Sequence, residues 1–168
     1  MLFTPKKFSR GIKVSDKMSD DGRYYHDIAE DLGVEIRDLE EFCAAPAPSA
    51  NSASRVTASA PDLSDFDVLV DCILGTGFRG EVRGRARSAI EAVNRSKAYV
   101  ISVDINSGLN GDTGEAKLAV RSDLTVSIGY FKQGLFNGDA WKYIGSLTNA
   151  DIGIVLLDPE REPAHEGE

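Results

Sequence analysis

The chain has 168 residues, with 27 acidic and 19 basic side chains, a formal net charge of −8 and an apolar fraction of 42%. The length predicts one globular domain with a real core, and the acidic balance argues against a general nucleic-acid binder. No apolar run is long enough to cross a membrane and no signal peptide opens the chain, so we expect a cytoplasmic protein in which Cys43 and Cys72 are reduced thiols.

The chain up to about residue 40 predicts a partial α/β unit. Residues 1–8 are short and basic, which is typical of the end of a strand and the loop that follows it. Ser19 is a candidate helix N-cap, and Gly33 is a candidate stop. Between them an apolar stripe of helical period is formed by Tyr24, Tyr25, Ile28, Ala29 and Leu32. A short strand is expected to begin at Val34.

Two further segments differ in composition from the rest of the chain. Residues 44–61 are rich in Ala, Ser and Pro and lack large apolar side chains, which predicts a flexible loop that contributes nothing to a core. Residues 158–168 form an acidic, proline-containing tail. We therefore expect a single domain over residues 1–157, interrupted by the 44–61 loop.

The central feature is an apolar run that opens into a glycine-rich turn at residues 67–80. The run predicts a strand buried on both faces, as in a parallel sheet, with Cys72 packed inside it. The glycines permit positive φ and close approach of backbone N–H groups to a ligand. A helix expected from about Gly84 to Ser96 follows the turn, and a helix N-terminus is a ready site for phosphate.

Two further strands are expected at residues 99–103 and about 124–128, with weaker signals at 144–147 and 152–157. Alternating strands and helices favour a parallel sheet, in which ligands bind beyond the carboxyl ends of the strands. All three well-predicted strands end in unusual residues. Together they predict one site with a phosphate-binding loop, two carboxylates (Asp71, Asp104), a hydroxyl (Ser107) and Lys132. The plainer alternative is that each carboxylate caps neighbouring backbone.

By pattern alone, residues 75–80 also match G-x-G-x-x-G, with an acidic residue at the end of the next strand. That match predicts a dinucleotide-binding dehydrogenase. Asp71 inside the strand and the oxygen-rich loop after Asp104 argue against it.

The segments 71–77 (DCILGTG) and 103–114 (VDINSGLNGDTG), followed by Lys132, resemble the NAD(P)H-hydrate epimerases, the YjeF N-terminal domain family. The resemblance runs from about residue 67 to 154. It implies a Rossmann-like three-layer α/β/α sandwich with a mostly parallel sheet, usually a homodimer. The implied activity interconverts the R and S hydrates of NADH and NADPH, so that a partner NAD(P)H-hydrate dehydratase can restore the S form.

The resemblance also implies roles for residues. Asp71 and Ser107 correspond to ligands of a potassium ion, the implied cofactor, and oxygen donors suit such a hard cation. Asp104 corresponds to a catalytic residue that contacts the substrate, and Lys132 would stabilise a negative group or shuttle a proton. The loop that contacts the substrate corresponds to Gly75, Thr76, Gly77, Phe78, Arg79, Gly80 and Glu81.

This sequence departs from the family pattern at two places. Asn106 stands where many members have proline. The family's glycine- and asparagine-rich loop, G-x-G-N-N-x-G-D-G in form, occurs nowhere in this sequence. We therefore expect an N-terminally truncated domain, either from a miscalled start or as a remnant. A non-catalytic remnant that binds a nucleotide or a protein is the alternative function, and an NAD(P)-dependent oxidoreductase is a third.

Overall fold

The structure is a computed structural model that describes residues 10–40, 63–64 and 66–155. The expected loop at 44–61, the first eight residues, Cys43 and the tail at 158–168 lie outside these ranges.

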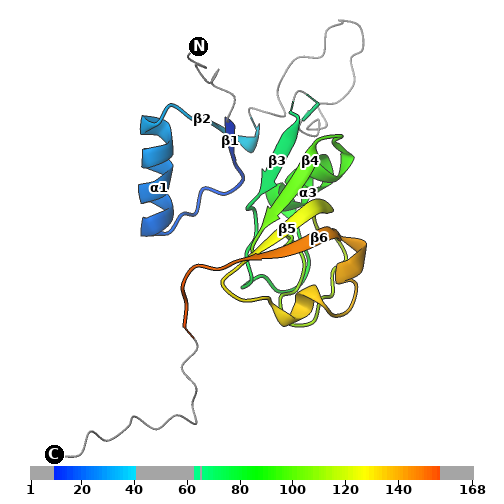
Figure 1. The fold of residues 1–168 in the computed structure, drawn as a ribbon. Helices are drawn as coiled ribbons and strands as arrows, with labels where there is room; N and C mark the ends of the chain where they lie inside the picture. Colours follow the sequence, from blue (N-terminus) through cyan, green and yellow to red (C-terminus); the bar gives the residue numbers. More distant parts are fainter. Residues whose placement is uncertain (1–9, 41–62, 65, 156–168) are drawn as a thin grey trace, which may run out of the picture.

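Two parallel sheets make up the described fold (Figure 1). In the smaller sheet, β1 (Arg10–Lys13) pairs with β2 (Glu35–Asp38). The larger sheet has the order β3-β4-β5-β6, with every neighbouring pair parallel. Its strands are β3 (Val68–Asp71), β4 (Tyr99–Val103), β5 (Ser122–Ile128) and β6 (Ile144–Ala150). Two short 3-10 helices, η1 (Gln133–Leu135) and η2 (Ala140–Lys142), lie between β5 and β6. The predicted Rossmann-like α/β class is confirmed.

Helix α1 (Asp20–Asp31) crosses over between β1 and β2. Its predicted ends are confirmed: the Ser19 hydroxyl accepts a hydrogen bond from the N–H of Gly22 at 3.1 Å, and Gly33 follows with a φ of +80°. The predicted apolar stripe is present, but no residue of α1 is buried. Figure 1 shows the helix standing apart from the larger sheet.

Helix α3 (Gly84–Arg95) connects β3 to β4 and begins where the sequence predicted. Its apolar face packs on the larger sheet, where Val100 and Leu69 join the same core. The buried side chains that α3 contributes are Ala89, Ile90, Ala92 and Val93. A second core forms beyond the strand ends, around the buried Ile105 and Leu109.

The predicted burial of β3 on both faces is wrong. Val68 and Val70 are 51% and 61% exposed, because β3 is an edge strand and α3 packs on the face that carries Leu69. Cys72 follows the strand and is exposed, so the prediction that it packs inside is also wrong.

The remaining strands differ from prediction mainly in length. Strand β6 extends the predicted 144–147 segment to residue 150, whereas residues 151–155 are irregular, so the described part of the predicted strand at 152–157 is wrong. Strand β1 was not predicted. Within the described ranges, neither α1 nor α3 has the length and apolar content that a bilayer crossing requires.

Candidate functional site

The residues singled out from the sequence gather at the carboxyl ends of β3, β4 and β5. Asp71 is the last residue of β3, Asp104 directly follows β4, and Lys132 follows β5 after a turn. They form two hydrogen-bonded clusters. One is built on Asp71 and Ser107, and the other on Asp104 and Lys132.

The Asp71 carboxylate is only 1% exposed and accepts hydrogen bonds from the protein at both oxygens. Its Oδ1 accepts from the Ser107 hydroxyl at 2.5 Å and from the N–H of Ile73 at 3.3 Å. Its Oδ2 accepts from the Ser102 hydroxyl and the Ser107 N–H, both at 2.9 Å. These donors satisfy a charge that would otherwise be costly to bury. The network therefore ties the end of β3 to β4 and to the loop after it.

Asp104 is held in a strained backbone conformation. It has a φ of +71°, the sole positive φ of a non-glycine residue among those described, and such a conformation costs roughly 1–3 kcal/mol. The Asp104 N–H donates to the carbonyl of Val126 at 2.7 Å, and its Oδ1 accepts from the N–H of Ile128 at 3.0 Å. These contacts to β5 hold the side chain at the strand ends. No described donor contacts Oδ2, and the side chain is 30% exposed.

Lys132 points back at Asp104. Its Nζ forms an ion pair with Asp104 Oδ1 and donates to the carbonyl of Ile128 at 2.9 Å. It also lies 3.4 Å from the hydroxyl of Ser127. An ammonium group has three donors, so the described groups occupy all of them. The structure thus brings the predicted acid and lysine together.

The glycine-rich loop is open at its beginning and tied down at its end. Among described groups, none accepts a hydrogen bond from the N–H of Gly75, Thr76 or Gly77. Arg79 donates to the carbonyl of Thr76 at 2.7 Å and pairs with Asp112 at 2.5 Å, so it braces the loop itself. Phe78 is partly buried against the core, and Gly80 has a φ of +91°.

The Glu81 side chain forms ion pairs outside the cluster of Asp104 and Lys132. It pairs with Lys117 and Arg83, and the hydrogen bond from Lys117 holds the pKa of Glu81 below its usual value. No described interaction joins Glu81 to Asp104 or Lys132.

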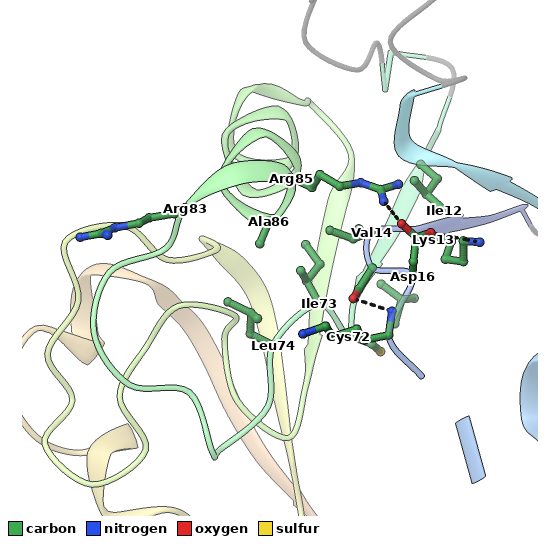
Figure 2. A pocket seen from close by; sticks show the side chains of 13 residues that line it. Ile12, Lys13, Val14, Asp16, Cys72, Ile73, Leu74, Arg83, Arg85 and Ala86 are labelled. Carbon is green, nitrogen blue, oxygen red and sulfur yellow. Dashed lines mark hydrogen bonds and ion pairs between the residues drawn. The ribbon is translucent and has the colours of Figure 1, made fainter. Parts of the chain in front are cut away.

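A cavity of about 670 Å³ opens at the carboxyl ends of β1 and β3 (Figure 2). Ile73 and Leu74 line it from the β3 side, and Arg83 and Arg85 line it at the start of α3. Cys72 also lines it, where partial desolvation of the thiol and the adjacent Asp71 carboxylate raise the pKa of Cys72. Asp104 and Lys132 do not line this cavity.

Asn106, which the sequence marks only as a departure from the family pattern, is a structural centre of the fold. It is fully buried, and its side-chain N–H₂ donates to Ser122 Oγ at 2.9 Å and to the carbonyls of Val120 and Tyr143, both at 3.0 Å. Its Oδ1 accepts from Thr125 Oγ1 at 2.7 Å. It thus joins the loop after β4 to β5 and to the approach to β6. The turn-like composition of residues 104–114 concealed this role.

Replacing Asn106 with alanine is expected to lower the free energy of unfolding by about 2–4 kcal/mol, because several buried partners lose their hydrogen bonds at once. Urea unfolding followed by circular dichroism measures the loss. Asn149→Ala is the control, since the exposed Asn149 side chain donates one bond, to the carbonyl of Gly129. A loss below about 1 kcal/mol at Asn106 would contradict its structural role.

The oxygen atoms near Asp71 have the chemistry that a potassium ion requires. Ser107 Oγ lies 2.5 Å from Asp71 Oδ1 and 3.2 Å from the carbonyl oxygen of Leu74, and hard cations prefer such donors. The same Oγ accepts the N–H of Leu74 at 2.8 Å. This set therefore suits the ion in donor type, and further oxygens would be needed to complete a coordination shell.

Comparison with known proteins gives consistent matches. Residues 9–134 match the family described as "YjeF-related protein N-terminus". The chain is 45% identical over 119 residues to the bifunctional NAD(P)H-hydrate repair enzyme Nnr of Methanothermobacter thermautotrophicus, which covers 62% of this chain and 23% of that protein. It is 32% identical over 140 residues to the NAD(P)H-hydrate epimerase of Oenococcus oeni, covering 83% of this chain and 57% of that enzyme.

A third relative, the NAD(P)H-hydrate epimerase of Levilactobacillus brevis, is 36% identical over 104 residues, which is 61% of this chain and 48% of that enzyme. The chain therefore spans about half the length of these epimerases and about a quarter of the bifunctional enzyme.

Proposed function

Because the chain belongs to the family of YjeF-related protein N-termini, we propose that it acts as an NAD(P)H-hydrate epimerase, an isomerase that interconverts the R and S hydrates of NADH and NADPH. Relatives named for this activity match 83% and 61% of the chain, and the family match over residues 9–134 contains the candidate site. The observation that carries the proposal is Asp104, whose Oδ1 is anchored by Ile128 and Lys132 while its Oδ2 contacts no described donor.

That arrangement suits general acid–base chemistry. Inverting the hydroxyl-bearing carbon requires the hydroxyl to leave as water, which takes up one proton, and water to return from the other face, which releases one proton. Asp104 Oδ2 is the group proposed to supply and recover this proton. Lys132 is proposed as a positioning residue, because the described groups already occupy its three donors.

The glycine-rich loop is the proposed contact for the substrate's pyrophosphate. No group in the described part of the chain accepts a hydrogen bond from the N–H of Gly75, Thr76 or Gly77, and backbone N–H groups bind phosphate oxygens well. Phe78, Arg79, Gly80 and Glu81 stay part of the proposed substrate loop. Of these, Arg79 would act by bracing the loop through Asp112.

Potassium is the proposed cofactor, with Asp71 and Ser107 among its oxygen ligands. When bound, it would supply positive charge next to the glycine-rich loop. We expect saturating potassium to raise the melting temperature by about 2–5 °C over sodium at equal ionic strength, as ligand linkage predicts. Differential scanning calorimetry measures the shift, and Ser107→Ala should remove it. Equal melting temperatures in the two salts would contradict a potassium site.

The biological setting of the activity is also a proposal. The bifunctional relatives are named as repair enzymes, which supports a functional link to an NAD(P)H-hydrate dehydratase. We propose a cytoplasmic location and a homodimer, following the family resemblance.

A coupled assay tests the function. The purified chain is mixed with R-NADH hydrate, an S-specific dehydratase with its nucleotide, and potassium, and recovery of NADH is followed by absorbance. We expect recovery above the spontaneous rate. No recovery from a chain that circular dichroism shows to be folded would contradict the epimerase. Calorimetric binding of the hydrate without recovery would instead leave a nucleotide-binding module.

A further inference from the structure

Strand β5 buries hydroxyl groups at positions where a strand inside a parallel sheet normally carries apolar side chains. Ser122, Thr125 and Ser127 are all buried, and Thr125 and Ser127 are 0% exposed. The hydroxyls of Ser122 and Thr125 bond to the buried side chain of Asn106. The described bonds of Ser127 lie outside that network, so the burial of its hydroxyl needs a separate explanation.

Ser127 bonds to the turn that leads from β5 to Lys132. Its Oγ donates its one proton to the carbonyl of Tyr130 at 2.9 Å. Because that proton is engaged, the lone pairs of Oγ can only accept a hydrogen bond, and Lys132 Nζ lies 3.4 Å away as a donor. The direction of both bonds is therefore fixed, and the hydroxyl of Ser127 contacts two positions of the turn at once.

Main-chain bonds hold the other positions of this turn. Gly129 has a φ of +73°, and its N–H donates to the carbonyl of Ala150 in β6 at 2.8 Å. The carbonyl of Ile128 accepts both the N–H of Tyr130 and Lys132 Nζ, each at 2.9 Å. The turn thus returns the lysine side chain onto the end of β5, where only 20% of that side chain is exposed.

The three described acceptors of the Lys132 ammonium differ in charge. Asp104 supplies a carboxylate, whereas Ile128 and Ser127 supply neutral oxygens. A lysine side chain is long and flexible and ends in a compact charge, so a single ion pair does not define where the ammonium lies. The two neutral acceptors fix the position of the ammonium without competing with Asp104 for its charge.

We propose that Ser127 is a positioning residue of the candidate site, whose buried hydroxyl holds the ammonium of Lys132 against Asp104 Oδ1. The inference rests on the proposed epimerase, in which Asp104 Oδ2 exchanges the proton while Oδ1 is anchored. None of the described hydrogen bonds joins Ser127 to Asp104, so Ser127 acts through Lys132. Loss of its hydroxyl should therefore loosen the lysine first and slow the reaction as a consequence.

The position of the ammonium is tested first, without any turnover. The side-chain ammonium group of Lys132 is followed by proton–nitrogen NMR of the full chain, and its signal is assigned as the one that Lys132→Met removes. We expect Ser127→Ala to speed hydrogen exchange of this group about fivefold, the change that corresponds to one hydrogen bond. Ser127→Thr retains the hydroxyl and should keep the wild-type exchange rate within about twofold.

Epimerisation kinetics then show whether this placement matters to the reaction. In the coupled assay we expect Ser127→Ala to lower kcat about fivefold and to leave KM within about twofold, because Ser127 is not proposed to contact the substrate. Ser122→Ala is the matched control, since it also removes a buried hydroxyl from β5, but one that bonds to Asn106. Its kcat should stay within about twofold of the wild-type value.

A double-mutant cycle separates an action through Lys132 from a general effect on the fold. When Lys132 is already methionine, the further change Ser127→Ala should leave kcat within about twofold of the Lys132→Met variant. An equal loss of kcat in both backgrounds would overturn the proposal, and so would an unchanged ammonium exchange rate in Ser127→Ala. If the wild-type chain shows no epimerisation, the proposed function fails, whereas the ammonium signal still decides whether Ser127 holds Lys132.

Discussion

Replacing Asp104 with asparagine is expected to lower the rate of hydrate epimerisation by about 100-fold or more, since a positioned acid or base contributes roughly 10²–10⁴-fold to such a step. Asparagine retains an oxygen that can accept the N–H of Ile128, so the backbone around residue 104 should persist. Its amide cannot exchange a proton at neutral pH. The coupled assay, run with the dehydratase in excess, measures the rate.

A matched control separates this effect from the loss of a charge. Asp139 also pairs with a lysine, Lys142, but it lies at the N-cap of η2 rather than directly after β4. Asp139→Asn should leave the rate within about twofold, because loss of an exposed ion pair has little effect. An Asp104→Asn protein with unchanged activity and an unchanged circular dichroism spectrum would refute the catalytic assignment.

Lys132 is tested with the same assay as a positioning residue. Lys132→Met leaves Asp104 Oδ1 with the N–H of Ile128 as its described donor, and the rate should fall. Lys132→Arg should recover part of it, because a cation again lies beside the carboxylate. A purely structural lysine would instead show losses of stability that track the losses of activity in both variants.

The parts of the fold that follow from local pattern could be predicted from the sequence. Helix α3 and strand β4 combine a clear period with nearby turn residues, and both occur where expected. The Ser19 cap depends on neighbouring residues alone, and it too is confirmed. Strand β1 escaped prediction because its four residues, RGIK, are half polar and have no alternation that identifies a buried face.

Burial could not be predicted in the same way, because it depends on which elements lie nearby. The run around β3 is apolar enough for the middle of a sheet, yet Val68 and Val70 are exposed because β3 is an edge strand and α3 packs on its other face, the one that carries Leu69. The apolar stripe of α1 is exposed in the same way, since Tyr24 is 63% and Tyr25 is 68% exposed. An apolar segment tends to be buried, but only the fold shows whether another element packs on it.

The sequence predicted which residues gather at the strand ends better than it predicted how they are arranged there. The strand ends were enough to expect Asp71, Asp104, Ser107 and Lys132 at one edge of the sheet, and the structure divides them into a cluster of Asp71 with Ser107 and a cluster of Asp104 with Lys132. The positive φ of Asp104 and the role of Ser102 depend on strand register, which no local pattern encodes. Asn106 was missed for the same reason, because all its partners are distant in the sequence.

Replacing Asp71 with alanine is expected to lower the free energy of unfolding by about 3–5 kcal/mol, the cost typical of breaking a buried charged network. The substitution leaves the hydroxyls of Ser102 and Ser107 and two backbone N–H groups without their acceptor. Domains of this size are typically stable by only about 5–15 kcal/mol, so the melting temperature should fall steeply. Urea unfolding measures the change.

Ser102→Ala provides a reference value for the loss in the free energy of unfolding. It removes one of the bonds to Asp71 and should cost about 1–2 kcal/mol. A loss at Asp71 well above the loss at Ser102 would mean that the carboxylate holds β3 to β4 and to the loop after it, whether or not an ion binds. A loss near zero at Asp71 would contradict the structural role. The burial of this carboxylate would then have to be explained by a ligand, and a melting temperature that depends on potassium would identify that ligand.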